Sequence, residues 1–323
     1  MATLNNRKSG HVVPRSWGRM RYALLMVACC GILARPSEAA RVGAESHLGP
    51  GRAIPCAYSP AAQVVWETNS PTPMAKKEKE PITHVKQWMR LFEGSALYKH
   101  EPSRLLEDYL DLVLCAVANG RQEERYLQVA KRYTREELTT ISELFAMHVL
   151  IHEHQVKEHR WYDMLGDIYM ELASRSKASR MGQFFTPVEL CDVLAMLTLE
   201  NPADAEGKTA CDPACGSGRT LLALHALQPK MGVLCAADLD PICAKMCALN
   251  FWLHGIRGEV AWMDSLRQKW FFAWQTHPRY TWPFVTFLGE ERQEDSLLYR
   301  ERHVMLPPTP AEAPAVIIQP TLF

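Results

Sequence analysis

Beyond residue 81, apolar residues recur every three or four positions, as one face of an α-helix requires. The first such group is Ile82, Val85, Trp88, Met89 and Phe92. Ser103 is the predicted cap of a second helix, which ends near Asn119. Thr134 and Glu137 form a capping box that opens a long third helix. We therefore predict an all-helical domain at residues 74–178.

The pattern changes after residue 178, where short apolar runs bounded by Gly, Pro and Asp alternate with helical spacing. Alternation of this kind is typical of βαβ units and a parallel sheet. The predicted elements are a strand ending at Cys211, a helix at 219–227, a strand at 232–237, a helix at 241–254 and a strand at 259–263. The sequence thus predicts an α/β domain at residues 179–303, with three successive strands of a partial, doubly wound, Rossmann-like sheet.

A glycine-containing loop joins the first of these strands to the first helix. Its sequence is Asp-Pro-Ala-Cys-Gly-Ser-Gly, from Asp212 to Gly218. Gly216 and Gly218 permit a tight turn and the close approach of a ligand to the backbone at the carboxyl end of a strand. The loop has neither the Lys of a GxxxxGK[ST] loop nor the spacing of GxGxxG, which disfavours a nucleoside triphosphate or a dinucleotide.

Acidic residues follow the next two strands. Asp238 stands at the end of the second strand, where a ribose-binding carboxylate would lie, and Asp240 is an alternative for the same role. Asp264 ends the third strand and is placed to accept a hydrogen bond from an adenine amino group. A single acid in such a loop is more often a helix cap. The ordered set of Asp212, Asp238 and Asp264 nevertheless predicts one adenosyl pocket.

The two ends of the chain differ in composition from the middle. Residues 1–73 hold eight basic and three acidic residues and little periodicity. We expect them to be a disordered leader or an over-extended reading frame, with Met74 as the working start. A 13-residue apolar run at 22–34 imitates a secretory signal, which is the alternative. Residues 304–323 contain five prolines and one charge and are predicted to be a tail.

Composition narrows the classes of partner and compartment. Thirty-six basic and thirty-six acidic residues give no net charge, so a polyanionic partner needs a local basic patch. No apolar run reaches the ~20 residues of a membrane span. The ten cysteines lie mostly in apolar runs and are predicted to be buried thiols of a cytoplasmic protein. His148 and His152 are predicted to be surface or boundary histidines, and no metal site is expected.

Four blocks in this part of the chain resemble a known family. Gly182-Gln183-Phe184-Phe185-Thr186-Pro187 precedes the glycine loop, and Asp238-Leu239-Asp240-Pro241 with Asn250 and Asp264-Ser265-Leu266 follow it. Together they are similar to the adenine-N6 DNA methyltransferases allied to the modification subunits of type I restriction systems. The similarity runs from about Tyr162 to about Leu266, and GQFFTP followed by DPACGSG is rarely found outside this family.

The resemblance implies S-adenosyl-L-methionine as the cofactor and DNA as a partner, with no membrane and no metal. In the family, the FTP segment and the glycine loop hold the methionine part of the cofactor. The acid after the second strand binds the ribose hydroxyls, and the acid after the third strand meets the adenine. The cofactor residues implied here are Phe185, Thr186, Pro187, Asp212, Gly216, Gly218, Asp238 and Asp264.

The sequence departs from the family beyond the third strand. Family members carry Asn-Pro-Pro-Tyr or Asn-Pro-Pro-Phe there, whose acceptors and aromatic ring hold the flipped adenine. This chain has no such tetrapeptide. His277 and Tyr280, in His-Pro-Arg-Tyr, are the nearest substitutes and our candidate catalytic residues. The alternatives are a catalytically degenerate cofactor-binding or DNA-associated accessory protein, and a chain that needs a separate target-recognition subunit.

Aromatic and basic residues cluster around these two positions. The cluster comprises Trp270, Phe271, Phe272, Trp274, Tyr280, Trp282 and Phe284, with Arg267, Lys269 and Arg279 nearby. Interleaved rings and basic groups are typical of a stacking platform for unpaired bases. The alternative, which we prefer at this point, is that the rings cover the exposed edge of a shortened sheet.

Overall fold

A computed structural model describes residues 84–175, 185–199, 201–280 and 283–300. The predicted leader at 1–73 and the predicted tail at 304–323 lie outside these residues, as do Ile82 and the first part of the GQFFTP block. Within the described ranges, no helix combines the length and the apolar character needed to cross a bilayer.

The amino-terminal part of the described chain is helical, as the apolar spacing predicts. Its helices are α2 (Val85–Phe92), α3 (Pro102–Ala116), α4 (Glu123–Ala130), α5 (Arg135–Glu158) and α6 (Met164–Arg175). The capping box of Thr134 and Glu137 at the start of α5 is confirmed. The predicted cap at Ser103 is wrong, because the carboxylate of Glu101 accepts from the backbone amides of Ser103 and Arg104 instead.

The histidines of α5 are not on the surface. His148 and His152 are both buried, so the prediction of surface or boundary positions is wrong. The helix is covered on this face, and the ring of His148 hydrogen-bonds through Nδ1 to the Tyr109 hydroxyl at 3.0 Å. Burial lowers the pKa of His148 to about 3. The imidazole is therefore a neutral core group.

The carboxyl-terminal part contains the predicted βαβ units. The three predicted strands are β1 (Ala210–Asp212), β2 (Leu234–Asp238) and β3 (Gly258–Asp264), which pair in parallel and in chain order. They are joined by α8 (Arg219–Leu227) and α9 (Pro241–Leu253), and α7 (Val188–Thr198) with a short 3₁₀ turn (Pro202–Ala205) precedes them. The prediction of a partial Rossmann-like sheet preceded by helices is confirmed.

The aromatic segment after Asp264 extends this sheet. It forms β4 (Lys269–His277) and β5 (Phe284–Leu288), which pair antiparallel in the order β3-β4-β5. The segment predicted to cover the edge of the sheet does lie along β3, but it does so as two further strands of the same sheet, which we did not predict. Gln275 and Thr276 are polar residues within β4, and both have partners: Gln275 donates to Glu259, and the Thr276 hydroxyl donates to the Ile256 carbonyl. A final 3₁₀ helix (Glu290–Asp295) follows.

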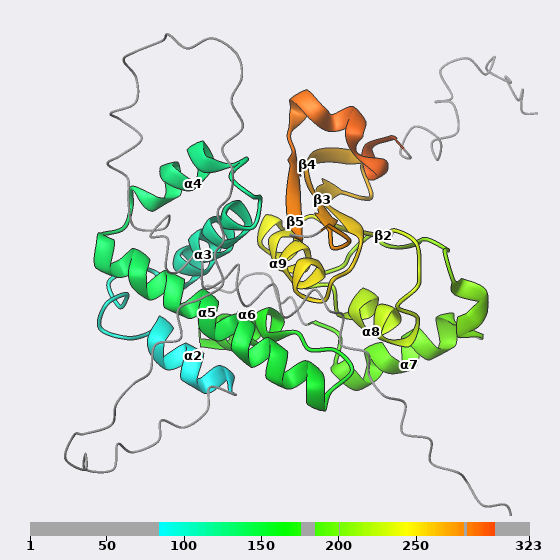
Figure 1. Cartoon of the computed structure of the whole chain (residues 1–323), viewed down its shortest axis with the longest axis horizontal. Coiled ribbons are helices and arrows are strands. Elements are labelled where there is room, and N and C mark those ends of the chain that lie inside the picture. The colour runs from blue at the N-terminus through cyan, green and yellow to red at the C-terminus, as the bar shows by residue number, and fades with distance from the viewer. Residues whose placement is uncertain (1–83, 176–184, 200, 281–282, 301–323) are drawn as a thin grey trace, which may run out of the picture.

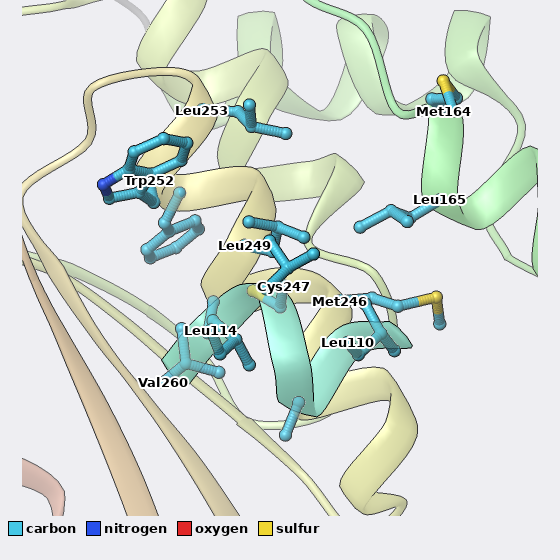
Figure 2. Close-up of a cluster of buried hydrophobic side chains, with 14 of the residues drawn as sticks. Leu110, Leu114, Met164, Leu165, Met246, Cys247, Leu249, Trp252, Leu253 and Val260 are labelled. Atoms are coloured by element: carbon cyan, nitrogen blue, oxygen red, sulfur yellow. The ribbon is translucent and has the colours of Figure 1, made fainter. Parts of the chain in front are cut away.

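Helix α9 is the centre of the main core. It lies between the helical part and the sheet (Figure 1), and its Met246, Leu249 and Leu253 point toward Leu110 and Leu165 of the helical part (Figure 2). The Lys245 ammonium group adds ion pairs to Glu107 and Asp111 of α3. The helical and α/β parts therefore share one continuous core.

The two faces of the sheet are covered differently. Residues of α8 and α9 pack in the same core cluster as one face. The opposite face, with Ala237 and Met263, packs against Leu298 and Tyr299. Leu298 and Tyr299 belong to a helical turn at residues 297–300, so among the described residues the second face is covered by one short helical turn. Helices on both faces of the sheet, as in a doubly wound fold, stay a prediction.

The described cysteines follow the prediction of buried thiols with one exception. Cys115, Cys191, Cys215, Cys235, Cys243 and Cys247 are buried, and no disulfide joins any of the described cysteines. Cys211 is exposed, because β1 is the edge strand of the sheet. No group of three or more His, Cys, Asp or Glu side chains in the described ranges is arranged to hold a metal ion.

Candidate cofactor site

The glycine loop between β1 and α8 adopts a conformation that side chains disfavour. Gly216 has a φ of 54° and Gly218 a φ of 95°. A Cβ atom on Gly216 would lie 2.9 Å from the Phe185 ring, and one on Gly218 would lie 2.7 Å from the Cys247 sulfur. Backbone angle and space therefore both require glycine at these two positions.

The carboxylate of Asp238 holds this loop from the end of β2. One oxygen accepts from the Gly216 amide at 2.8 Å, and the other accepts from the Asp240 amide at 2.8 Å. Burial raises the pKa of Asp238, while the two amide hydrogen bonds act in the opposite direction. Each oxygen keeps a lone pair for a further donor, so the group can accept from two hydroxyls of a ligand.

The structure separates the two acids that the sequence left as alternatives. Asp240 is the N-cap of α9, since its carboxylate accepts a hydrogen bond from the Ile242 amide at 2.8 Å. It also accepts one from the Tyr169 hydroxyl at 3.3 Å. Asp240 is thus occupied as a helix cap, whereas Asp238 contacts the glycine loop. Of the two, Asp238 is the better placed for a ligand.

Asp264 and Asp212 lie at the same edge of the sheet. The Asp264 carboxylate accepts from the Arg267 amide at 2.9 Å and from its guanidinium at 2.7 Å. The backbone hydrogen bond from Arg267, followed by the one from its side chain, lowers the pKa of Asp264. The neighbouring Ser265 hydroxyl donates to the Pro213 carbonyl at 2.7 Å and joins this loop to the glycine loop. Asp212 accepts from the Ala214 amide and from the hydroxyl of Thr220.

The described part of the GQFFTP block lies over the glycine loop. The centroid of the Phe185 ring lies 5.4 Å from that of the Tyr169 ring. The guanidinium carbon of Arg219 lies 5.7 Å from the Phe185 centroid. The Thr186 carbonyl accepts from Arg219 at 3.5 Å, and Pro187 is the N-cap residue of α7. The structure therefore brings together the segments that carry all eight predicted cofactor residues.

Sequence reasoning missed the buried acid that ties these segments together. Asp163, which is 3% exposed, accepts from the Ser217 hydroxyl and from Arg219 Nε, each at 2.6 Å. Its other oxygen accepts from the Asn250 amide group at 2.7 Å and the Gly166 backbone amide at 2.9 Å. One carboxylate thus joins α6, the glycine loop, α8 and α9.

A usable signal for this network was present in the sequence. Gly166 belongs to the Leu-Gly-Asp-Ile-Tyr block at the start of the resemblance, and a Cβ atom on it would lie 2.0 Å from an Asp163 oxygen. Any larger residue at this position would collide with that carboxylate. Nothing local to Asp163 indicates its side-chain partners, which are 54 to 87 residues away along the chain.

The candidate catalytic residues are not brought to this edge. Because β4 runs antiparallel to β3, Thr276 pairs with Gly258 at the beginning of β3, and His277 lies next to it. Asp264 stands at the other end of the seven-residue β3. At a rise of about 3.3 Å per residue, His277 lies roughly 20 Å along the sheet from Asp264. Tyr280 packs against Phe284 at that far end.

A cavity of about 510 Å³ opens beside the Asp163 network. Its lining includes Trp161, Asp163, Asp167 and Asp192, from the segment before α6 through to α7. None of Asp212, Asp238 and Asp264 lines it. The cavity therefore adjoins the candidate site from the side of α6 and α7, and the three strand-end acids are not among its lining residues.

Comparison with known proteins agrees with the motifs. Residues 160–294 match the family model described as N-6 DNA Methylase. The type I restriction enzyme MjaIX methylase subunit of Methanocaldococcus jannaschii is 26% identical over 118 residues, which cover 34% of this chain and 20% of that protein. The crystal structure of a type I restriction-modification methyltransferase subunit from Streptococcus thermophilus is 19% identical, with a TM-score of 0.30, over 53% of this chain and 44% of that one.

The matched region includes every described element from α6 to β5 and all but the last residue of the 3₁₀ helix at Glu290–Asp295. The resemblance to the adenine-N6 DNA methyltransferases is confirmed by this match, and the chain is methyltransferase-like over residues 160–294. It spans about a fifth of the length of the curated relative.

Proposed function

We propose that this chain binds S-adenosyl-L-methionine at the carboxyl ends of β1, β2 and β3 and forms the cofactor-binding part of an adenine-N6 DNA methyltransferase. The observation that carries the proposal is the Asp238 carboxylate, held between the Gly216 and Asp240 amides beside a glycine loop. It lies in the segment that matches the N-6 DNA methylase family. A function on DNA with this cofactor also supports a cytoplasmic location.

The residues at this edge fit the adenosyl part of the cofactor. Asp238 would accept from the two ribose hydroxyls, and Asp264, with lone pairs left by Arg267, would accept from the adenine amino group. Gly216 and Gly218 leave the backbone open to close approach. By the family resemblance, Asp212 and the segment from Phe185 to Pro187 would hold the methionine part.

The cofactor supplies a methyl group on a positively charged sulfur, and its transfer is a direct in-line displacement without a covalent enzyme intermediate. The work of this chain is therefore binding and orientation. Asp238 would hold the ribose end of the adenosyl group, and Asp264 would hold the adenine end. The hydrogen bond from Ser265 to Pro213 fixes the segment after Asp264 to the glycine loop.

Cofactor affinity is expected to depend on pH through Asp238. The ionised carboxylate accepts from ribose hydroxyls, whereas the protonated group loses acceptor capacity. Burial raises the pKa of Asp238, so affinity should be constant near neutral pH and should fall on acidification at a higher pH than an ordinary Asp, of pKa about 3.9, would give. Calorimetric titrations over a pH series measure this. Asp238→Asn should remove the pH dependence, and an unchanged profile in that variant would refute it.

A partner chain is part of the proposal because this chain has no assigned hydrogen-bond acceptors for the amino group of the target adenine. The adenine amino lone pair is delocalised into the ring, and family members use two acceptors to direct it. The tetrapeptide that supplies them is absent from this sequence. His277 and Tyr280 lie at the other end of the sheet, so we assign them no role in methyl transfer.

The surface beside the candidate site supports a partner. In the described ranges β1 pairs only with β2, and its other edge is free. The adjoining helix α7 exposes a row of apolar side chains, namely Val188, Leu190, Val193, Leu194, Met196 and Leu197. Several exposed apolar side chains on one helix favour an interface with a partner. It lies on the side of the sheet where the cofactor loop begins.

Transfer of labelled methyl from S-adenosyl-L-methionine to adenine in DNA tests the proposed function. The chain alone is expected to bind the cofactor and to transfer methyl weakly or not at all, and added subunits of a type I methylase should restore transfer. His277→Ala and Tyr280→Ala should not change cofactor binding. Robust transfer by the chain alone that survives both substitutions would place the acceptor elsewhere in this chain, and absence of cofactor binding would refute the proposal.

The second candidate is a catalytically degenerate accessory protein, which the missing tetrapeptide favours. It predicts cofactor binding with no transfer under any combination of subunits. The family matches do not favour it, since they are to methylase subunits. The same assay therefore separates the two candidates.

A further inference from the structure

The end of the sheet opposite the candidate cofactor site contains a second cavity. Its volume is about 270 Å³, and it lies where β2 and β3 begin, lined by Leu234, Trp252, Ile256 and other residues of α8, α9 and the segment after β4. Ligand pockets range from roughly 300 to 1,000 Å³. The cavity is slightly smaller than this range, so it suits a small group such as a phosphate.

The charged groups at this cavity are all basic. None of its lining residues is acidic, and they include Arg257, Arg279, His225 and His254. Arg257 and Arg279 are exposed and form no ion pair with a carboxylate of the described residues. Burial lowers the pKa of His225 to about 4, which leaves its ring neutral and able to donate or accept. Two guanidinium groups without carboxylate partners favour an anionic ligand.

Aromatic rings adjoin the basic rim. Phe284 stacks on His277 with 4.6 Å between centroids, and the guanidinium carbon of Arg121 lies 4.6 Å from the Phe284 centroid. Tyr280 lies 5.1 Å from Phe284 and is 61% exposed. Burial, and then the charges of Arg121 and Arg257, lower the pKa of His277. Three arginines and an exposed ring thus converge at this end.

We propose that this end of the sheet binds a nucleoside phosphate, with the phosphate on Arg257 and Arg279 and the base stacked on Tyr280. Guanidinium groups match phosphate oxygens in geometry and charge, and an exposed tyrosine ring is a stacking surface for any base. A free nucleotide and an unstacked nucleotide of a single strand share this chemistry. The site lies roughly 20 Å along the sheet from Asp264 and is independent of the cofactor site.

Binding of a fluorescein-labelled oligothymidylate to the full chain, followed by anisotropy, tests this. Arg257→Gln combined with Arg279→Gln is expected to weaken binding roughly tenfold or more, and added salt should weaken binding by the parent. Tyr280→Ala is expected to weaken it roughly fivefold or more. Arg90→Gln, at an exposed arginine of α2, is the matched control and should bind like the parent.

Competition distinguishes the sources of the ligand. Displacement of the oligonucleotide by adenosine monophosphate would identify a free nucleotide as a ligand, and resistance to it would identify the nucleic-acid strand; either supports the site. Unchanged affinity in the double arginine variant overturns the proposal. Equal competition by inorganic phosphate together with normal binding by Tyr280→Ala also overturns it, because the site would then hold only an anion. Melting curves of the exposed-residue variants should match that of the parent.

Discussion

Replacing Asp163 with alanine is expected to lower the free energy of unfolding by about 3 to 5 kcal/mol, the usual cost of removing one partner from a buried ion pair. The side chains of Asp163 and Arg219 are 1% and 5% exposed. The substitution leaves the guanidinium, the Ser217 hydroxyl and the Asn250 amide without their shared acceptor. Thermal and denaturant unfolding of the full chain would measure the loss, which corresponds to a melting shift of roughly 10 °C.

The matched control for this substitution is Asp167→Ala. Asp167 pairs with the same arginine at 2.7 Å, but its side chain is 44% exposed. Solvent screens such a pair, so its loss should cost about 1 kcal/mol or less. Equal destabilisation by the two variants would show that the buried network is not what stabilises this region.

Replacing Asp238 with alanine is expected to weaken S-adenosyl-L-methionine binding about 30- to 150-fold. The substitution removes the acceptor for two ribose hydroxyls at a partly buried position, and an unmatched polar contact of this kind costs about 2 to 3 kcal/mol. Part of the effect is expected to come from the Gly216 amide, which loses its acceptor and no longer holds the glycine loop. Calorimetric titration of parent and variant measures the ratio.

Two further variants make this test specific. Asp204→Ala, in the exposed 3₁₀ turn before β1, should bind the cofactor like the parent. Asp240→Ala should reduce stability through the lost cap of α9 and change affinity much less than Asp238→Ala. If Asp240→Ala has the larger effect on affinity, the ribose contact belongs to Asp240. Equal affinity in all variants would refute the proposed adenosyl pocket.

The three parallel strands and the two helices between them could be predicted from the sequence because each is specified locally. The helix α8 was predicted with its observed bounds, and β2 and β3 differ from prediction by one or two residues at each end. Apolar runs bounded by Gly, Pro and Asp determine these elements, and parallel pairing follows from the helices between them. The placement of Asp212, Asp238 and Asp264 at one edge then follows, since parallel strands end together.

The hairpin of β4 and β5 could not be predicted from its own pattern. Gln275 and Thr276 are buried or half-buried polar residues, which argue against a strand when taken alone. Their partners, Glu259 and the Ile256 carbonyl, lie on or next to β3, 16 and 20 residues earlier. Only pairing with β3 makes these polar positions acceptable, because a buried polar group is tolerated when it is hydrogen-bonded.

The sequence by itself thus determined the glycine loop, the strand-end acids and the family resemblance, since each depends on a few neighbouring residues and on the order of strands. The tertiary structure alone decided that β4 returns antiparallel, which carries His277 and Tyr280 to the end of the sheet opposite the acids. It also decided that Asp163 joins partners 54 to 87 residues away. Contacts between distant residues depend on how the elements pack, and no periodicity or local motif encodes that packing.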